Sequence, residues 1–490
     1  MNLLTDPWIP VREEGVFRHL RLRELLCSEG DRRLSLPRDD MEMTALQMIV
    51  CLVQVIFMPA DADELKMHIA SPMDEADYDT AVEPFVEWFD LVHPDHPFMQ
   101  VRGVKAQHIT GIQKLFVGLP EGSGHTFFNT ASEVTKACAS CTAIAIFNQA
   151  SNSPSFGGGF KEGLRGGTPV TTLVVGDSLR ETIWFNVLNK EYIVTLLPWI
   201  HDVKDMPVWV QPIESGKDIP VYDIGLLRGL FWQPVHVELD SSYGMGRCDV
   251  CASKELSLYG GFKKEKFRFN VIGIWPHPHS PRYWNVKGGD RKERFLSFTT
   301  VAPTWTKLNE ILVWNVSDKE GHIPAPVLDH YCKVFAPGRW LHLSVGGYRN
   351  KQASILQRRH DFFSLAGGWD GALDKLYRLI TTGLEIKEIL HKKLYRFGKE
   401  LESDILAKAL SWRGSEAFYY RSEPIVHRTL REMDWRKAVE VQAAFKKEMT
   451  GIARNIFEET TRPYSHDPKM LAVVALCRRS LELDFQKIDR

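Results

Sequence analysis

The C-terminal part of the chain constrains the fold more than any other feature, because it changes to long, nearly unbroken helical periodicity. From about Gly367 onward, apolar residues recur at steps of three and four, a spacing that gathers them on one face of an α-helix. The clearest stripe begins after Asp434 and consists of Ala438, Val441, Phe445, Met449, Ile452 and Ile456. Such a stripe is buried by packing against other helices, so the pattern predicts a helical domain.

Three further stripes accompany this one. Asp467-Pro468 suits a helix start, since a capping carboxylate precedes a proline that needs no N–H partner at the first position. Leu373 begins another helix, and Glu416 to Leu430, interrupted by Pro424, supplies the fourth. Four helices with short connections predict an antiparallel four-helix bundle over residues 365–490. The stripe after Pro468 consists of Leu471, Val474, Leu481, Phe485 and Ile488.

Residues 1–364 read as a mixed α+β body with short strands and frequent Gly and Pro turns. Thr168 to Val175 and Thr182 to Leu188 are β-rich runs around a Gly-Asp turn, and Trp340 to Val345 alternates like a strand. Ala45 to Ala60 is apolar but shorter than the ~20 residues of a membrane span, and is expected to form a buried helix. The predicted class is therefore α+β, with domains at 1–364 and 365–490.

Charge and the N-terminal sequence restrict the classes of function. The chain has 61 Lys and Arg against 62 Asp and Glu, a net charge of -1, so any nucleic-acid contact must be local. The first residues lack a basic segment followed by an apolar one, so a secretory signal is not expected. We expect a cytoplasmic protein with no membrane partner.

Four of the eight cysteines form two CxxC pairs, Cys138 with Cys141 and Cys248 with Cys251. Two such pairs can place four thiolates around one zinc ion, a closed structural site without an open position for catalysis. The pairs lie much further apart than the ~15 to 20 residues of compact zinc modules, so zinc would join distant segments. Redox dithiols or an empty cluster remain alternatives.

Three polar segments are candidates for nucleic-acid contact. Glycines 157–159, followed by more glycines up to 167, permit close backbone approach to a ligand, although a flexible turn is equally compatible. Around Lys266, basic and aromatic residues alternate, which also fits a solvated strand face. The polar loop 348–354 follows a strand and could face phosphates or be an exposed connection. The His-Asp pairs at 201, 360 and 466 lack the further ligands of a metal phosphohydrolase, so no active site is predicted.

Several longer and unusual motifs are distributed along the chain: Leu36-Pro37-Arg38 with Asp39-Asp40-Met41-Glu42, His96 to Gln100, Cys141 to Ala145, Phe156 to Thr172, Arg228 to Pro234, Trp275 to Pro281 and Gly346 to Asn350. Together these motifs resemble the CasA family, the large subunit of type I-E CRISPR Cascade complexes.

The resemblance implies a non-catalytic subunit that recognises the protospacer-adjacent motif on duplex DNA, starts strand separation and helps recruit the helicase-nuclease. It implies backbone contact to the motif at Gly157, Gly158 and Gly159, and a lysine finger at Lys266. Minor-groove readout is degenerate, so such elements fit a tolerant motif reader. The remaining implied sites are a wedge at Gln352 flanked by Lys351 and Ala353, and a guide-RNA and assembly loop at Phe127, Phe128 and Asn129.

The chain departs from the family pattern at two positions near these sites. Lys351 stands where asparagine is expected, and Ser155 stands where glycine is expected. Lys351 adds a positive charge beside the wedge, which we expect to strengthen phosphate contact and relax motif choice. Two other functions remain as alternatives: a zinc-dependent nuclease or phosphohydrolase, and a purely structural assembly subunit.

Overall fold

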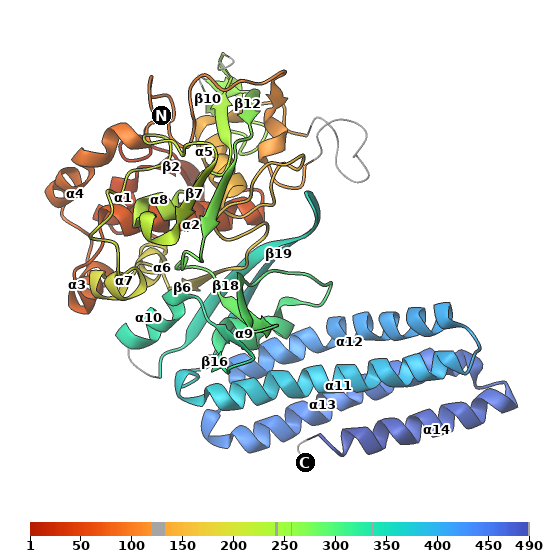
Figure 1. The fold of residues 1–490 in the computed structure, drawn as a ribbon. Coiled ribbons are helices and arrows are strands. Elements are labelled where there is room, and N and C mark those ends of the chain that lie inside the picture. Colours follow the sequence, from red (N-terminus) through yellow and green to blue (C-terminus); the bar gives the residue numbers. More distant parts are fainter. Residues whose placement is uncertain (120–132, 241–243, 256, 336–337, 489–490) are drawn as a thin grey trace. The chain divides into compact units, whose positions relative to one another are not determined.

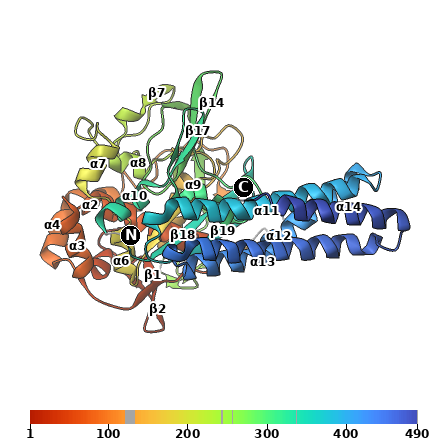
Figure 2. The ribbon, with the colours of Figure 1, turned by 90° about the horizontal axis from the view of Figure 1, so that it is seen from below.

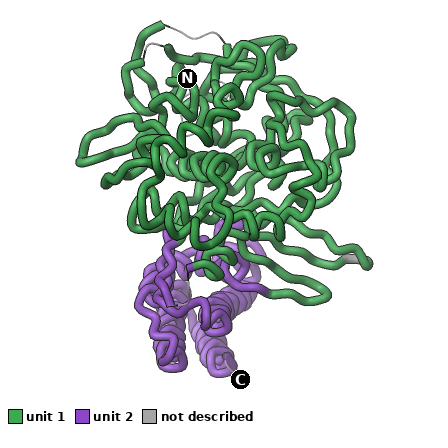
Figure 3. Tube along the Cα trace, turned by 90° about the vertical axis from the view of Figure 1, so that its left-hand side faces the viewer, with its two compact units in different colours: residues 1–299, 315–334, 343–361 green, residues 300–314, 335–342, 362–490 purple. Residues whose placement is uncertain are grey.

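A computed structural model of the chain describes residues 1–490 except 120–132, 241–243, 256, 336–337 and 489–490. The described chain divides into two compact units, coloured separately in Figure 3. Unit 1 consists of Met1–Thr299, Asn315–Val334 and Leu343–Asp361, and unit 2 of Thr300–Trp314, Phe335–His342 and Phe362–Arg490.

Two buried helices form the centre of unit 1. Helix α2 (Asp39–Ile56) is buried at Met41 and from Met43 to Gln54, so the buried helix expected in the apolar run 45–60 is present, although it ends at Ile56 (Figure 1). It packs against α5 (Ala139–Ser151), which is buried along most of its length. The other helices of unit 1 are short: α1 Leu22–Cys27, α3 Ala62–Ala70, α4 Glu75–Val82, α6 Leu179–Phe185, α7 Lys190–Leu196, α8 Leu226–Leu230 and α10 Pro326–Val334, with 3-10 turns η1 Glu83–Phe89, η2 Ile112–Leu115 and η4 Val221–Asp223.

The strands form several small sheets instead of one large one. Their orders are β2-β1-β3, β10-β9, β11-β5, β4-β12-β8, β13-β7, β15-β14-β17-β16 and β19-β18-β6; β13 and β7 pair in parallel. The bounds are β1 Ile9–Glu13, β2 Val16–Leu20, β3 Arg32–Leu34, β4 Thr110–Gly111, β5 Ala137–Cys138, β6 Thr171–Val175, β7 Lys217–Pro220, β8 His236–Leu239, β9 Gly246–Arg247, β10 Lys254–Glu255, β11 Leu258–Tyr259, β12 Gly261–Glu265, β13 Phe269–Ile272, β14 Arg282–Lys287, β15 Asp290–Phe295, β16 Asn315–Val316, β17 Glu320–Ile323, β18 Leu341–Lys351 and β19 Ser354–Leu365.

A buried carboxylate anchors the long β18–β19 hairpin to the start of α2. Tyr348 on β18 is 2% exposed, and its hydroxyl donates to Asp40 Oδ2 at 2.8 Å and accepts from Asn148 Nδ2 at 2.8 Å. The Asp40 carboxylate also accepts hydrogen bonds from the guanidinium group of Arg38, at 2.7 and 3.0 Å, and from that of Arg358 on β19, at 3.3 Å. Burial alone would raise the pKa of Asp40, but the hydrogen bonds and charges of Arg38 and Arg358 outweigh it and lower that pKa. The network holds the hairpin on the core of unit 1.

Unit 2 contains the predicted four-helix bundle. Its long helices α11 (Leu373–Lys399), α12 (Asp404–Glu432), α13 (Ala438–Thr461) and α14 (Pro468–Phe485) lie side by side in two views (Figures 1 and 2). A Cβ at Gly414 of α12 would lie 2.1 Å from Leu394 Cδ1 of α11, so glycine permits this close helix approach. Short elements complete the unit: η5 Thr304–Lys307, α9 Leu308–Leu312, η6 Asp370–Ala372, η7 Trp435–Lys437 and η8 Arg462–Tyr464.

Unit 2 also includes residues before the expected boundary at 364/365. Trp305 is fully buried, its ring centroid lies 6.2 Å from that of Tyr419, and a Cβ at Gly383 would be 3.3 Å from its ring. Asn309 donates to the Tyr377 carbonyl at 3.3 Å. These contacts attach segment 300–314 to the bundle. The two compact units are defined by packing, whereas the boundary at 364/365 concerns domains that fold independently. That boundary stays a prediction.

Three local expectations were wrong. Thr182 to Leu188 is not a strand: α6 spans Leu179–Phe185, because the Ser178 side chain caps it by accepting from the Glu181 N–H. The helix expected from Glu416 begins at Asp404 and continues through Pro424, which is exposed, so the carbonyl that loses its donor can face water. Leu471, predicted to be buried, is 54% exposed, because Met470 and Cys477 complete the buried face of α14 together with Leu481 and Phe485, which were predicted. None of the described helices combines the length and apolar character required to cross a bilayer.

Candidate metal centre and nucleic-acid interface

The two CxxC pairs meet although more than a hundred residues separate them. Cys138 ends β5 and caps α5, whose first turn contains Cys141. Cys248 and Cys251 lie in the turn between β9 and β10. Strand β11 returns to pair with β5, placing Leu258 opposite Cys138. Asp249 joins the β9–β10 turn to the segment before β5, since its carboxylate accepts hydrogen bonds from the N–H groups of Thr135 and Lys136 at 2.8 and 3.0 Å.

The four sulfurs have the spacing of a tetrahedral thiolate site. Their Sγ atoms all lie within 4.8 Å of one another, and Cys138 Sγ is 3.7 Å from Cys251 Sγ. Zinc–sulfur bonds of ~2.3 Å in a tetrahedron place sulfurs ~3.8 Å apart. Backbone N–H groups point at the sulfurs: Cys138 N donates to Cys248 Sγ at 3.3 Å and Cys141 N to Cys138 Sγ at 3.4 Å. The cluster can hold a metal ion.

Electrostatics of the cluster favour a bound cation. Hydrogen bonds from the Cys138 and Cys141 side chains lower the pKa of Cys248 to about 7, whereas the adjacent Cys138 sulfur raises the pKa of Cys141 well above its usual value. One thiolate in the cluster thus opposes ionisation of its neighbours. Four thiolates in contact require a compensating positive charge, which a soft divalent ion such as zinc provides. The donor set therefore fits zinc, although its identity stays a prediction.

The glycine segment forms a turn directly beyond α5. Gly157, Gly158 and Gly159 have φ angles of +79°, +58° and +87°, a left-handed region that other residues adopt at a cost of ~1–2 kcal/mol each. The Phe160 N–H donates to the Gly157 carbonyl at 3.1 Å, which closes the turn. Gly158 and Gly159 are exposed. The unusual glycine composition therefore meets a conformational requirement.

Lys266 extends from a break between two strands onto this turn. Its Nζ donates to the Gly158 carbonyl at 3.0 Å. The expected alternation is present, since Phe267 and Phe269 are buried while Lys266 and Arg268 are exposed. The prediction of a single strand through these residues was wrong, because β12 ends at Glu265 and β13 begins at Phe269.

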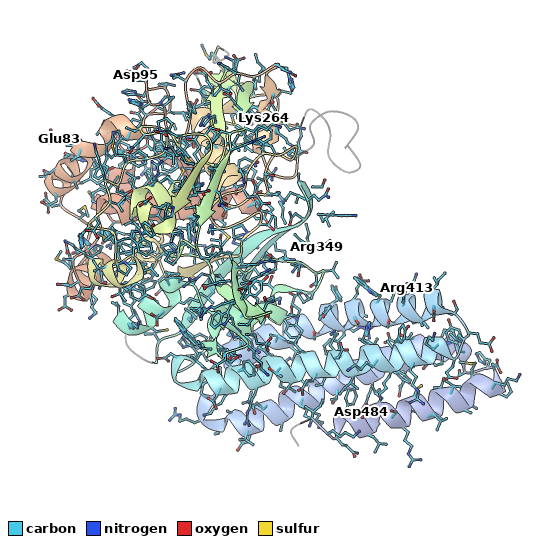
Figure 4. The ribbon with its side chains drawn as sticks, viewed as in Figure 1. Glu83, Asp95, Lys264, Arg349, Arg413 and Asp484 are labelled. Atoms are coloured by element: carbon cyan, nitrogen blue, oxygen red, sulfur yellow. The ribbon has the colours of Figure 1, made fainter. Side chains whose placement is uncertain are left out.

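The β18–β19 hairpin presents Lys351, Gln352 and Ala353 at its tip, all exposed. Gln352 has a φ of +54°, which is unusual for a residue with a side chain. The Asn350 side-chain amide donates to the Gln352 carbonyl at 2.6 Å, and Asn350 Oδ1 accepts from Thr168 Oγ1 at 2.9 Å. The tip is therefore held in a defined conformation. Figure 4 labels Arg349, just before this tip, and Lys264 on β12.

The three segments meet in space. A Cβ at Gly157 would lie 3.3 Å from Ala353 Cβ, and one at Gly159 would lie 3.7 Å from Lys266 Nζ. We call this group, Gly157–Gly159 with Lys266 and Lys351–Ala353, the loop cluster. Neither lysine of the loop cluster forms an ion pair within the described part of the chain. The loop cluster thus offers backbone groups and two uncompensated positive charges at the surface of unit 1.

Other expectations have different outcomes. Phe127, Phe128 and Asn129, expected as an assembly loop, lie outside the described residues. His360 Nε2 pairs with Ser344 Oγ at 2.8 Å. The four cysteines form the single group of three or more potential metal ligands among the residues with described placement. Sequence reasoning assigned no role to Asn350, although it belongs to the Gly346 to Asn350 motif, which was the available signal.

Comparisons with known proteins agree on one family. The model of the family "CRISPR-associated protein Cse1" matches residues 2–456. A curated relative, the CRISPR-associated protein CasA/Cse1 of Thermus thermophilus, is 25% identical over 229 residues; the match spans 44% of this chain and 43% of the relative. A crystal structure of a CRISPR-associated protein from Thermus thermophilus has a TM-score of 0.74 at 17% identity, covering 100% of this chain and 99% of that one.

A chain from a structure of a CRISPR RNA-guided surveillance complex is also similar, with a TM-score of 0.70 at 18% identity and coverage of 98% of this chain and 99% of that one. At these identities the solved structures establish a shared fold, while the family model spans most of the sequence. The chain belongs to the CRISPR-associated Cse1 family.

Proposed function

We propose that this chain is the non-catalytic large subunit of an RNA-guided Cascade surveillance complex that recognises the protospacer-adjacent motif on duplex DNA and starts strand separation. Family membership and the similar chain in a surveillance complex support the assembly role. The convergence of the glycine turn, Lys266 and the hairpin tip supports the DNA role. Its partners would be the other Cascade subunits, the guide RNA, target duplex DNA and the helicase-nuclease, in the cytoplasm.

The loop cluster suits minor-groove reading. Lys266 is held by the Gly158 carbonyl, so its ammonium group is positioned before DNA arrives. Exposed glycines allow the backbone to approach base edges closely. Because the minor groove distinguishes base pairs only partly, a backbone element with one lysine gives tolerant recognition. Sequence specificity would then come from pairing with the guide RNA, as in another CRISPR effector type.

Gln352 suits the role of a wedge beside the motif. It stands at the tip of a two-residue turn with its backbone held by Asn350. Opening a base pair requires energy, since DNA stacking contributes ~1.4 kcal/mol per step. A rigid tip can maintain that distortion, whereas a mobile one would lose conformational entropy on insertion. Lys351 adds a charge next to the tip, which favours nearby phosphates.

We propose a structural zinc ion at Cys138, Cys141, Cys248 and Cys251. When bound, zinc would neutralise the thiolates and join α5 to the β9–β10 turn. Four cysteine ligands would leave no position for a water molecule. This arrangement counts against the alternative of a zinc-dependent nuclease or phosphohydrolase. Metal-dependent DNA cleavage by the purified chain would favour that alternative.

Target-duplex binding by the reconstituted complex tests the proposal. DNA with a correct or scrambled motif is titrated into complexes that carry wild-type chain, Lys266→Ala, Gln352→Ala or the control Lys263→Ala, whose Nζ lies 3.6 Å from Glu238. We expect motif-dependent binding to weaken for the first two variants and persist for the control. Equal binding in all complexes, with assembly intact, would instead indicate a purely structural subunit.

A further inference from the structure

A small cavity lies beneath the base of the β18–β19 hairpin, inside unit 1. Helices α2 and α5 line it together with strands β6 and β18, through Thr44, Gln47, Asn148, Thr171 and Gly346, which are all buried. The cavity has a volume of about 20 Å³. A buried water molecule requires about 10–15 Å³, so the cavity admits a single water and no larger ligand.

The side-chain amide of Gln47 borders this cavity without a partner from the protein. Gln47 is 0% exposed, and neither its Nε2 nor its Oε1 has a hydrogen-bond partner within the described part of the chain. Buried polar side-chain atoms are nearly always bonded, either to protein or to ordered water. Two unbonded atoms on one buried amide, next to space for a water molecule, therefore indicate a binding site.

A second buried glutamine of the same helix is bonded in the usual way. Gln54 is 2% exposed, its Nε2 donates to the Leu188 carbonyl at 2.9 Å, and its Oε1 accepts from the Leu188 N–H at 2.6 Å. Helix α2 thus accommodates a buried amide where backbone groups meet it, which does not happen at Gln47. A neutral partner is favoured at Gln47, since Asp40 lines the same cavity and the guanidinium of Arg165 bonds to its wall.

Other oxygens of the lining can accept a further hydrogen bond. Asn148 Oδ1 accepts from Thr44 Oγ1 at 3.0 Å, and Thr171 Oγ1 accepts from Arg165, which is 4% exposed, at 2.9 Å. Each of these two oxygens has a second lone pair. A water that accepts from Gln47 Nε2 and donates to two of the lining oxygens would form about three hydrogen bonds, the usual number for a buried water.

We propose that the cavity binds one internal water molecule, which joins Gln47 of α2 to Asn148 of α5 and Thr171 of β6 beneath strand β18. This water is a second polar support for the hairpin, beside the bond from Tyr348 to Asp40. It connects elements that are distant in the sequence and whose side chains alone leave the Gln47 amide unbonded. The inference does not depend on the DNA role, because no residue of the loop cluster takes part.

A crystal structure of the full chain, at a resolution that locates ordered water, tests the site. We expect one density peak within about 3.2 Å of the Gln47 amide, and none at the Gln54 amide, whose bonds are already made. In Gln47→Leu, an apolar side chain of similar size, the peak should be lost. A wild-type map without the peak, or with the Gln47 amide bonded to a protein atom instead, would overturn the proposal, and so would a peak that Gln47→Leu retains.

X-ray footprinting read by mass spectrometry tests the same site in solution, because radicals formed from a bound water oxidise the side chains beside it. Met43 lines the cavity, whereas Met48 of the same helix is fully buried and does not line it. We expect Met43 to be oxidised faster than Met48 in the wild-type chain, and to lose most of this difference in Gln47→Leu. Oxidation of Met43 at the same rate in both proteins would count against a water held by Gln47.

Discussion

Replacing Tyr348 with phenylalanine should loosen the hairpin that carries Gln352. The change removes one hydroxyl that donates to the Asp40 carboxylate and accepts from Asn148, both at 2.8 Å. A hydrogen bond to a charged group contributes about 1.5–3 kcal/mol, and the Asn148 amide would be left without this acceptor. Because Arg38 and Arg358 still pair with Asp40, we expect a loss of about 2 kcal/mol, near the lower end of the range.

Hydrogen exchange measured by mass spectrometry reads this change locally, which suits a chain with two units. A loss of about 2 kcal/mol corresponds to roughly thirtyfold faster exchange of amides that open with the hairpin. Peptides from β18 and β19 should show the increase, while peptides from the bundle should not. The control Tyr222→Phe alters a side chain that is 59% exposed and should change exchange little. Exchange in Tyr348→Phe within twofold of wild type would refute the anchoring role of the Asp40 network.

Three further outcomes follow from the site and the core. Gly157→Ala should impair motif-dependent DNA binding more than Gly158→Ala, because both have left-handed φ but only Gly157 faces the hairpin tip at 3.3 Å; equal losses in titrations would contradict that contact. Cys138→Ala should lose about one zinc per chain by elemental analysis and melt at lower temperature, whereas Cys27→Ser, remote from the cluster, should retain it. Burial lowers the pKa of His279 to about 3, below the ~6.5 of an unfolded chain, so its contribution to stability is complete above pH 6.5 and declines as the pH falls toward 3. The free energy of unfolding should therefore fall by about 1.4 kcal/mol between pH 7.5 and 5.5. Denaturation of His279→Gln should show a weaker dependence of that free energy on pH over the same interval.

Periodicity predicted the bundle because its helices are long and their stripes repeat many times. Ala438, Phe445, Met449 and Ile456 are buried as the stripe of α13 required. Short elements were less predictable, since Ser178 could override the β-rich run that follows it with one capping bond. Segment 300–314 carries no sequence signal for the bundle, because its attachment depends on long-range contacts of Trp305.

The candidate site likewise has features that could be predicted from the sequence and features that could not. Paired CxxC motifs and the glycine segment are local patterns, so the cysteines and Gly157–Gly159 could be named from the sequence. Their assembly could not, since the bond from Lys266 to Gly158 joins residues 108 positions apart and Asp40 reaches Tyr348 over 308. Arg165 was an ordinary arginine in the sequence; its burial without a carboxylate is visible only in three dimensions.

Opening of the first base pair beside the motif tests the central claim most directly. A 2-aminopurine at that pair brightens when its base unstacks, so fluorescence of the reconstituted complex on correct-motif duplex reports the wedge itself. We predict a rise with wild-type chain and with the control Gln357→Ala, which alters a glutamine further along β19, and no rise with Gln352→Ala or a scrambled motif. An equal rise with Gln352→Ala, or a rise that ignores the motif, would contradict strand opening by the loop cluster.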